Sequence, residues 1–175
     1  MDNIEIERQK QLEECVQDIW EYEKYLYVGA NKNRFHFKRM LRGKNVDVVE
    51  IDKDRCEELR RDGWNVLDID IADYTDRAGF LPLYEVAIWS HGPSCMVSYL
   101  QAIKAINNLK RFADIVVLMC PWGRYEAKAG NLYDTNWLAL YPDFFQDLGF
   151  DTSCLGGPDV NGSNLLSWWR RDLER

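Results

Sequence analysis

This sequence lacks closely spaced cysteines, and that absence excludes two common kinds of site. The chain contains five cysteines, an odd number, widely separated at positions 15, 56, 95, 120 and 154. No C-x-x-C pair occurs, so nothing indicates a zinc site, and the scattered spacing does not fit a disulfide framework. The pattern favours a protein whose thiols stay reduced.

Long apolar runs are also missing. No stretch approaches the roughly 20 apolar residues that a membrane-spanning helix requires. The first residues, MDNIEIERQKQLEE, are charged and lack the apolar core of a secretory signal peptide. Together with the cysteine pattern, these features predict a cytoplasmic protein without a membrane-embedded segment.

Positive charge is scarce overall. The 22 Lys and Arg are outnumbered by 29 Asp and Glu, and the net charge of -7 argues against nucleic acid as a partner. One group between positions 32 and 44 departs from this balance: Lys32, Arg34, His36, Lys38, Arg39, Arg42 and Lys44. It is either the solvated face of one helix or a patch that meets an anionic substrate.

The length and composition are those of one globular domain. A chain of 175 residues can bury a sizeable core but is too short for two ordinary domains. Hydrophobic residues make up 46% and charged residues 29%, as in soluble proteins. We therefore expect a single domain over residues 1–175.

Segments typical of strands alternate with segments typical of helices. Apolar and β-branched runs predict strands over 24–28, 46–51, 64–69, 84–90 and 113–120. Apolar residues at helical spacing predict an N-terminal amphipathic helix over 4–24, helices over 33–42 and 53–62, and a long helix capped by Ser94. Such alternation predicts β-α-β units and a parallel, doubly wound sheet.

The C-terminal part breaks the alternation. A short helix is expected over 141–150, followed by strands over 150–155 and 164–171. The connection of about eight residues is too short for a helical crossover, so these two strands should be antiparallel. The predicted fold class is α/β, with a mostly parallel seven-stranded sheet and an antiparallel terminal strand.

Several residues follow the predicted strands where α/β folds bind ligands. Gly29 ends the first strand within YVGANKN, and Glu50 ends the second strand, 21 positions later. A carboxylate such as that of Glu50 can accept two hydrogen bonds from a vicinal diol. Asp70 follows the third strand in DIDIAD, and Ser90 and His91 follow the fourth in IWSHGPSCM.

This order of elements and residues resembles the class I methyltransferases that use S-adenosylmethionine. The resemblance covers residues 24–171 and implies S-adenosylmethionine as cofactor, no metal, and a small-molecule or glycan-type acceptor. It implies that Glu50 binds the ribose, that Asp70 contacts the adenine amino group, and that His91 is a catalytic base. The full set of cofactor residues that it implies is Gly29, Ala30, Asn31, Glu50, Ile51, Asp70, Ile71 and Ser90.

The sequence also departs from the family pattern. Tyr27 stands where the family has an acid, and Asn31 and Asn33 stand at glycine positions, although Asn tolerates positive φ. Gly29 is explained equally by a tight strand-to-helix turn. Asp52 is an alternative ribose ligand or the cap of the next helix, and Asp68 and Asp73 compete with Asp70.

The segment 121–141 is longer than the usual connection in a compact domain. Connections beyond ~12 to 15 residues are often lids or binding loops. Its aromatic residues Trp122, Tyr125, Tyr133 and Trp137, with Arg124, Glu126 and Lys128 among them, predict a lid on the substrate side. The alternative is a satellite hydrophobic cluster that covers the edge of the sheet.

The function expected from this resemblance is methyl transfer. No D/N-P-P-Y/F tetrapeptide follows the fourth strand, which argues against methylation of a base or amide nitrogen of that kind. A nicotinamide-dependent oxidoreductase is an alternative, but the loop lacks the G-x-G-x-x-G glycines. A methyltransferase-like domain that only binds a partner is the other alternative.

Overall fold

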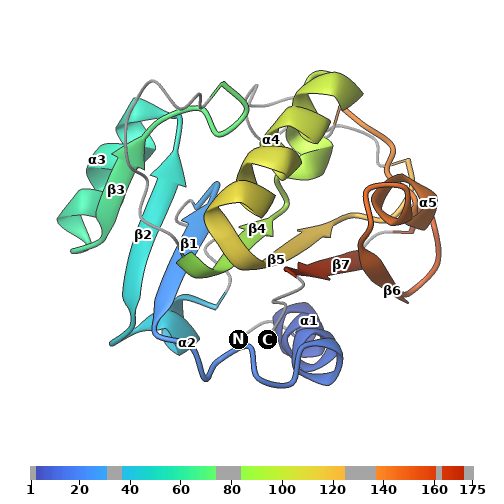
Figure 1. The fold of residues 1–175 in the computed structure, drawn as a ribbon, viewed down its shortest axis with the longest axis horizontal. Coiled ribbons are helices and arrows are strands. Elements are labelled where there is room, and N and C mark those ends of the chain that lie inside the picture. Colours follow the sequence, from blue (N-terminus) through green and yellow to red (C-terminus); the bar gives the residue numbers. More distant parts are fainter. Residues whose placement is uncertain (1–2, 31–36, 74–83, 125–136, 161–162, 172–175) are drawn as a thin grey trace.

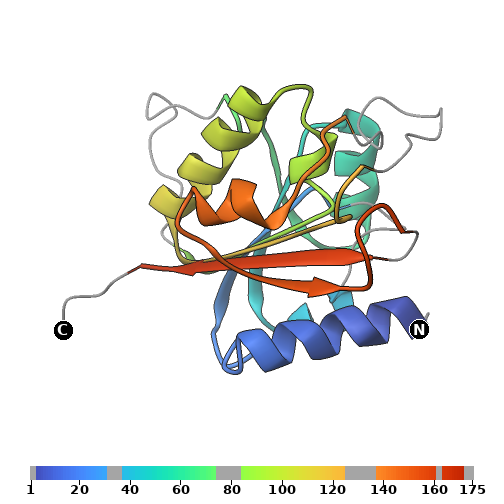
Figure 2. The ribbon, with the colours of Figure 1, turned by 90° about the vertical axis from the view of Figure 1, so that its right-hand side faces the viewer.

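The computed structural model describes residues 3–30, 37–73, 84–124, 137–160 and 163–171. It contains one seven-stranded sheet with helices on both faces (Figures 1 and 2). The strands are β1 (Lys24–Val28), β2 (Asn45–Glu50), β3 (Asn65–Asp68), β4 (Tyr84–Ser90), β5 (Ala113–Cys120), β6 (Asp151–Leu155) and β7 (Asn164–Arg170). The helices are α1 (Asn3–Cys15), α2 (Lys38–Leu41), α3 (Lys53–Arg61), the short 3-10 helix η2 (Pro93–Cys95), α4 (Tyr99–Phe112) and α5 (Pro142–Gln146).

The strand order is β3-β2-β1-β4-β5-β7-β6. Strands β1 to β5 run parallel, whereas β7 is antiparallel to both β5 and β6 and lies between them. In this register Cys120 of β5 and Cys154 of β6 both pair with Leu165 of β7. The predicted fold class is confirmed, including the antiparallel strand at the C-terminal end.

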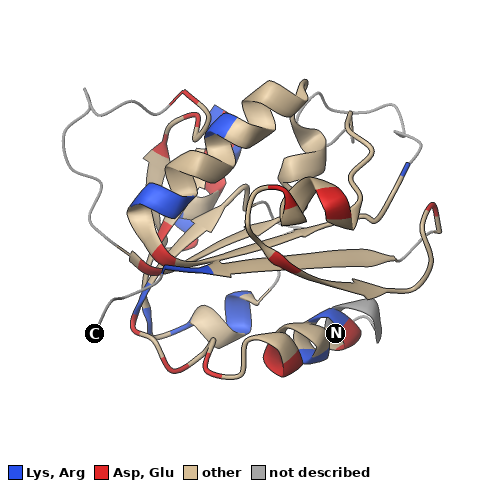
Figure 3. Cartoon of the chain, turned by 45° about the vertical axis from the view of Figure 1, so that its right-hand side comes forward, with Lys and Arg blue, Asp and Glu red and all other residues tan. Residues whose placement is uncertain are grey.

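Two hydrophobic clusters fill the space between the sheet and its helices. Buried residues of α4 and α5 pack with one set of strand side chains, and buried residues of α2, α3 and the N-terminal segment pack with the other. Helices α1 and α4 lie on opposite faces of the sheet (Figure 2). Charged residues lie mostly on the helices and at the strand ends, so the central sheet is apolar (Figure 3). This frame leaves the carboxyl ends of the parallel strands open to a ligand.

The N-terminal helix is shorter than predicted. It ends at Cys15 instead of residue 24, and the chain continues through turns in which the Ile19 N–H donates to the Val16 carbonyl at 3.0 Å. Val16 and Ile19 are nonetheless buried, which is why their spacing resembled a longer helix. The chain has to reverse here to enter β1, and the Tyr25 hydroxyl donates to the Ile19 carbonyl at 2.7 Å.

The predicted cap of the long helix was wrong by four residues. Ser98 caps α4 by accepting a hydrogen bond from the Gln101 N–H at 3.2 Å. Ser94 is instead buried in η2, where its carbonyl accepts from the Trp137 and Leu138 N–H groups at 2.8 and 3.1 Å. Both serines suit a cap chemically, and burial of the first one selects the second.

Two other predicted helices are shorter in the described structure. The helix predicted over 33–42 is described only from residue 37, and there α2 begins at Lys38. The helix predicted over 141–150 is limited to α5, because the chain turns at Gly149 before β6. Of the basic group, Lys38 pairs with Asp62 at 2.8 Å and Lys44 with Glu23 at 2.8 Å.

The described helices are short relative to a lipid bilayer. Among the described residues, no helix combines the length and the apolar character that would let it cross a membrane.

Candidate cofactor site

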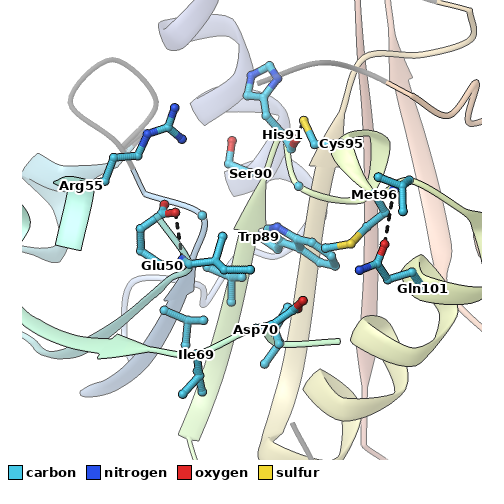
Figure 4. Close-up of a pocket in the computed structure, with 17 residues that line it drawn as sticks. Glu50, Arg55, Ile69, Asp70, Trp89, Ser90, His91, Cys95, Met96 and Gln101 are labelled. Carbon is cyan, nitrogen blue, oxygen red and sulfur yellow. Dashed lines mark hydrogen bonds between the residues drawn. The ribbon is translucent and has the colours of Figure 1, made fainter. Parts of the chain in front are cut away.

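A pocket of about 240 Å³ lies at the carboxyl ends of β1, β2, β3 and β4 (Figure 4). Ligands of open α/β sheets bind at this edge, outside the ends of the parallel strands. The pocket brings together the residues that end separate strands, and its lining comprises Val28, Gly29, Val49, Glu50, Ile51, Arg55, Ile69, Asp70, Ile71, Trp89, Ser90, His91, Gly92, Cys95, Met96, Val97 and Gln101.

Glu50 is the buried carboxylate of this pocket. Its side chain is 3% exposed, and Oε1 accepts hydrogen bonds from the backbone N–H groups of Ile51 and Asp52, both at 2.9 Å. Burial raises the pKa of this carboxyl above its ordinary value, against the opposing effects of the Asp52 N–H and of Arg55. The hydrogen bonds from described residues to this carboxylate both go to Oε1.

Asp52 caps the helix that follows. Its Oδ1 accepts from the N–H groups of Asp54 at 3.0 Å and Arg55 at 3.3 Å, and its Oδ2 lies 3.6 Å from Arg55 Nε. The capping role of Asp52 is thereby confirmed, and it does not line the pocket. Glu50 is therefore the carboxylate of this pair that lines the pocket.

Of the three acids after the third strand, only Asp70 lines the pocket. Its Oδ1 accepts from the Ala72 N–H at 2.8 Å, which orients the carboxylate in a short turn. Asp68 is exposed at the end of β3, and Asp73 closes the turn by donating its N–H to the Asp70 carbonyl at 3.2 Å. Ile71 also lines the pocket and is 3% exposed, so it contributes an apolar wall beside Asp70.

The glycine loop is only partly described. Gly29 lines the pocket with φ +72°, a conformation that L side chains rarely adopt, and its N–H donates to the Val49 carbonyl at 2.9 Å. The turn therefore requires a glycine whether or not a ligand is bound. Ala30 is fully buried in the core and does not line the pocket, while Asn31 lies outside the described residues. Tyr27 is buried in the same core.

Ser90 and His91 both line the pocket, as expected for residues that follow β4. Ser90 is 2% exposed, and His91 has φ +61° with its N–H donating to the Met119 carbonyl at 2.6 Å. His91 Nε2 also accepts a hydrogen bond at 2.9 Å from the guanidinium of Arg8, which lies on α1. Arg donates only, so the proton of the neutral imidazole lies on Nδ1.

The sequence interpretation missed Trp89, Met96, Gln101 and Arg8. Trp89 precedes Ser90 in the same motif, so its nearness to the site could have been noticed. Met96 lies in the connection before α4 and lines the pocket with Gln101. The contact of Arg8 with His91 joins residues 83 positions apart, and no local signal indicates it.

The segment predicted to be a lid is described only at its two ends. Gly123 donates through its N–H to the Leu140 carbonyl at 2.8 Å, so the two ends are held side by side. Trp137 is half exposed and its N–H bonds to Ser94 of η2, next to the pocket residue Cys95. Tyr125, Glu126, Lys128 and Tyr133 lie outside the described residues, and the lid stays a prediction.

Comparison with solved structures identifies the fold. The N-methyltransferase NodS from Bradyrhizobium japonicum WM9 has a TM-score of 0.68 at 14% identity, over 97% of this chain and 97% of that one. Magnesium protoporphyrin IX methyltransferase (ChlM) from Synechocystis PCC 6803 with bound SAM has a TM-score of 0.61 at 12% identity, over 95% and 81%. DesVI from Streptomyces venezuelae has a TM-score of 0.65 at 10% identity, over 94% and 91%. No protein-family model and no curated protein matches the chain.

These similarities extend over nearly the whole chain. Identities of 14% or less report shared architecture and not shared chemistry. The chain therefore has the fold of the class I S-adenosylmethionine-dependent methyltransferases.

Proposed function

We propose that this protein is an S-adenosylmethionine-dependent methyltransferase acting on a small-molecule or glycan-type acceptor. The observation that carries the proposal is the geometry of Glu50. One of its carboxylate oxygens is held by two backbone N–H groups, and the other faces the pocket at the end of β2. A ribose diol would find there a rigid, charged acceptor whose orientation is set before binding.

The pocket suits the rest of the cofactor as well. Asp70 places a second carboxylate at the end of the pocket near β3, where an adenine amino group could donate to it. Apolar side chains of Ile51, Ile71 and Met96 line the pocket and suit the faces of a flat base. The residues present therefore fit S-adenosylmethionine, with Glu50 as the ribose ligand and Asp70 as the adenine ligand.

When bound, S-adenosylmethionine supplies an electrophilic methyl group attached to a sulfonium. The protein then has to hold the acceptor in line with that group and exclude water, which is mainly work of positioning. Ser90 and His91 lie at the edge of the pocket where the acceptor would approach. With Nε2 accepting from Arg8, that nitrogen of His91 is not available as a base in this arrangement. His91 becomes a base at Nε2 only when the contact with Arg8 opens.

The acceptor class follows from similarity and charge. The neighbours include a magnesium protoporphyrin IX methyltransferase, and the acidic charge of -7 disfavours a nucleic acid. The five cysteines form no disulfide, which fits the cytoplasmic location that we propose. No observation favours the nicotinamide-dependent or the partner-binding alternative.

Calorimetric titration tests this function directly. S-adenosylmethionine and S-adenosylhomocysteine should bind with micromolar affinity, whereas NADH should not bind. Glu50→Ala should remove most of this affinity without unfolding the protein. Binding of NADH alone would replace the proposal with an oxidoreductase, and no binding by any of the three would favour a partner-binding domain.

A further inference from the structure

Trp89 occupies an unusual place in the pocket. It is the second-last residue of β4, is 2% exposed, and lines the pocket between Glu50 on one side and Met96 and Gln101 on the other (Figure 4). A Cβ on Gly29 would lie 3.5 Å from Trp89 Nε1, which is ordinary contact. The indole therefore packs directly against the glycine that ends β1.

A second glycine, Gly92, lies so close to the same indole that a side chain there would overlap it. A Cβ on Gly92 would lie 1.3 Å from Nε1 and 1.8 Å from Cε2 of Trp89. Its backbone dihedrals are φ -83° and ψ -51°, which alanine adopts without strain. The backbone thus does not require glycine at this position, and the indole ring does.

The indole nitrogen is a donor that needs an acceptor. A tryptophan Nε1–H can only donate, and when buried it usually finds a partner. No residue in the described part of the chain accepts a hydrogen bond from Trp89 Nε1. This atom is not one of the buried unpaired side-chain atoms, so it is open to the pocket that the side chain lines. An acceptor for this N–H is therefore expected from the ligand that fills the pocket.

We propose that Trp89 binds the cofactor by donating its Nε1–H to one of the cofactor's oxygens, an inference that rests on the proposed methyltransferase function. The sequence offers a single glycine in GANKN, where several glycines would bring backbone N–H groups to a ligand. Trp89 provides a side-chain donor directly beside Gly29. Gly29 and Gly92 are the two residues against which the indole packs, and we call them the seat of the indole. Gly29 also forms the turn after β1.

Binding measurements on matched tryptophan variants test this role. Trp89→Phe keeps an aromatic ring but removes the N–H, and should weaken S-adenosylhomocysteine binding about 3- to 10-fold. The control is Trp20→Phe, which also loses an indole hydrogen bond, from Nε1 to Glu13 Oε1 at 2.9 Å, but away from the pocket. Trp20→Phe should bind like the wild type, and equal affinities for all three proteins would overturn the role of Trp89.

Nuclear magnetic resonance gives a readout that does not depend on loss of packing. The chain has seven tryptophans, and the indole N–H signal that disappears in Trp89→Phe identifies Trp89. This signal should move downfield when S-adenosylhomocysteine binds to the wild type. An unmoved signal in a protein that binds the ligand would overturn this inference alone. Failure of the wild type to bind would overturn the proposed function and this role with it.

Two further arms complete the experiment. Gly92→Ala should weaken binding more than Trp89→Phe, because its Cβ must push the indole from its seat, while circular dichroism reports the fold. Wild-type affinity in Gly92→Ala would contradict the packing of the indole against Gly92.

Repeating the titrations with 5'-methylthioadenosine, which lacks the amino-acid part, assigns the oxygen that accepts from Trp89 Nε1. A loss for S-adenosylhomocysteine alone supports its carboxylate, and a loss for both ligands supports an oxygen of the ribose.

Discussion

The guanidinium of Arg8 donates a hydrogen bond to His91 Nε2 at 2.9 Å, which joins the N-terminal helix to the pocket. Arg8 is only 9% exposed, so this charge is held beneath α1 and not in solvent. The same helix is fixed by Gln11, whose amide bonds to Ser153 and Asn164. Gln11 thus holds α1 on β6 and β7, while Arg8 of the same helix contacts the His91 ring.

Replacing Arg8 should change the tautomer of His91. In the wild type at pH 8, the neutral ring of His91 should carry its proton on Nδ1, because Nε2 accepts from Arg8. In Arg8→Met the share of the tautomer protonated on Nε2 should rise, because Nε2 no longer accepts from the guanidinium. The ring nitrogen chemical shifts report this, and the signals are assigned with His91→Gln. Lys10→Met, on the exposed side of α1, is the control. A wild-type ring protonated on Nε2 would contradict the assignment.

Glu50→Gln should weaken S-adenosylhomocysteine binding by roughly 1.5 to 3 kcal/mol, because a charge-assisted hydrogen bond to the ribose is lost. The matched control is Glu85→Gln. Glu85 Oε2 also accepts from two consecutive backbone N–H groups, those of Glu23 and Lys24 at 2.9 and 2.8 Å, but at the opposite edge of the sheet. Calorimetry should show normal affinity for the control. Equal loss in both variants would indicate a general structural effect.

The stability of Glu50→Gln relative to the wild type should increase as pH rises. Burial raises the folded-state pKa of Glu50 above the ordinary 4.5, so the folded protein holds this proton more tightly than the unfolded chain does. The contribution of Glu50 to stability is therefore complete below pH 4.5 and is lost as pH rises through the folded-state pKa. The melting temperature of the variant relative to the wild type should increase between pH 4 and pH 7. A constant difference would argue against the raised pKa.

Asp70 and Asp68 should differ in their effect on binding. Asp70→Ala should weaken S-adenosylhomocysteine binding by about 1.5 to 3 kcal/mol if its carboxylate accepts from the adenine amino group. Asp68→Ala should have no effect, because Asp68 does not line the pocket. The inosine analogue of the ligand lacks the amino group, so its affinity should be insensitive to Asp70→Ala. An equal loss of affinity for both ligands would indicate that Asp70 maintains the shape of the pocket and does not recognise the adenine amino group.

Gln11→Ala should destabilise the fold. The Gln11 amide donates to the Ser153 carbonyl at 3.0 Å and accepts from Asn164 Nδ2 at 2.9 Å, and its removal leaves the buried Asn164 amide without this acceptor. Unpaired buried donors cost about 1 to 3 kcal/mol, which urea unfolding should detect. Gln9→Ala, which loses a hydrogen bond to Glu13 on the same helix, should cost less than half as much. Equal costs would show that Gln11 is no anchor of α1.

Much of the fold was predictable because its determinants are local. Strands β1, β4 and β5 have the predicted bounds, since continuous β-branched and apolar runs such as ADIVVLMC specify a strand buried on both faces. The antiparallel pairing of β6 and β7 followed from a connection too short for a crossover. Helix ends were less predictable, because Val16 and Ile19 keep helical spacing through a turn and because two serines compete to cap α4.

Local patterns in the chain predict the order of strands and helices. This order also predicts the edge of the sheet where Gly29, Glu50, Asp70 and Ser90 meet. Parallel strands place their carboxyl ends at the same edge of the sheet, so the backbone topology alone brings the residues at those ends together. The packing and hydrogen bonding of the side chains at this edge depend instead on the tertiary structure. The seat of Trp89 against Gly92 and the hydrogen bond from Arg8 to His91 depend on packing between segments distant in the chain, which local sequence patterns do not encode.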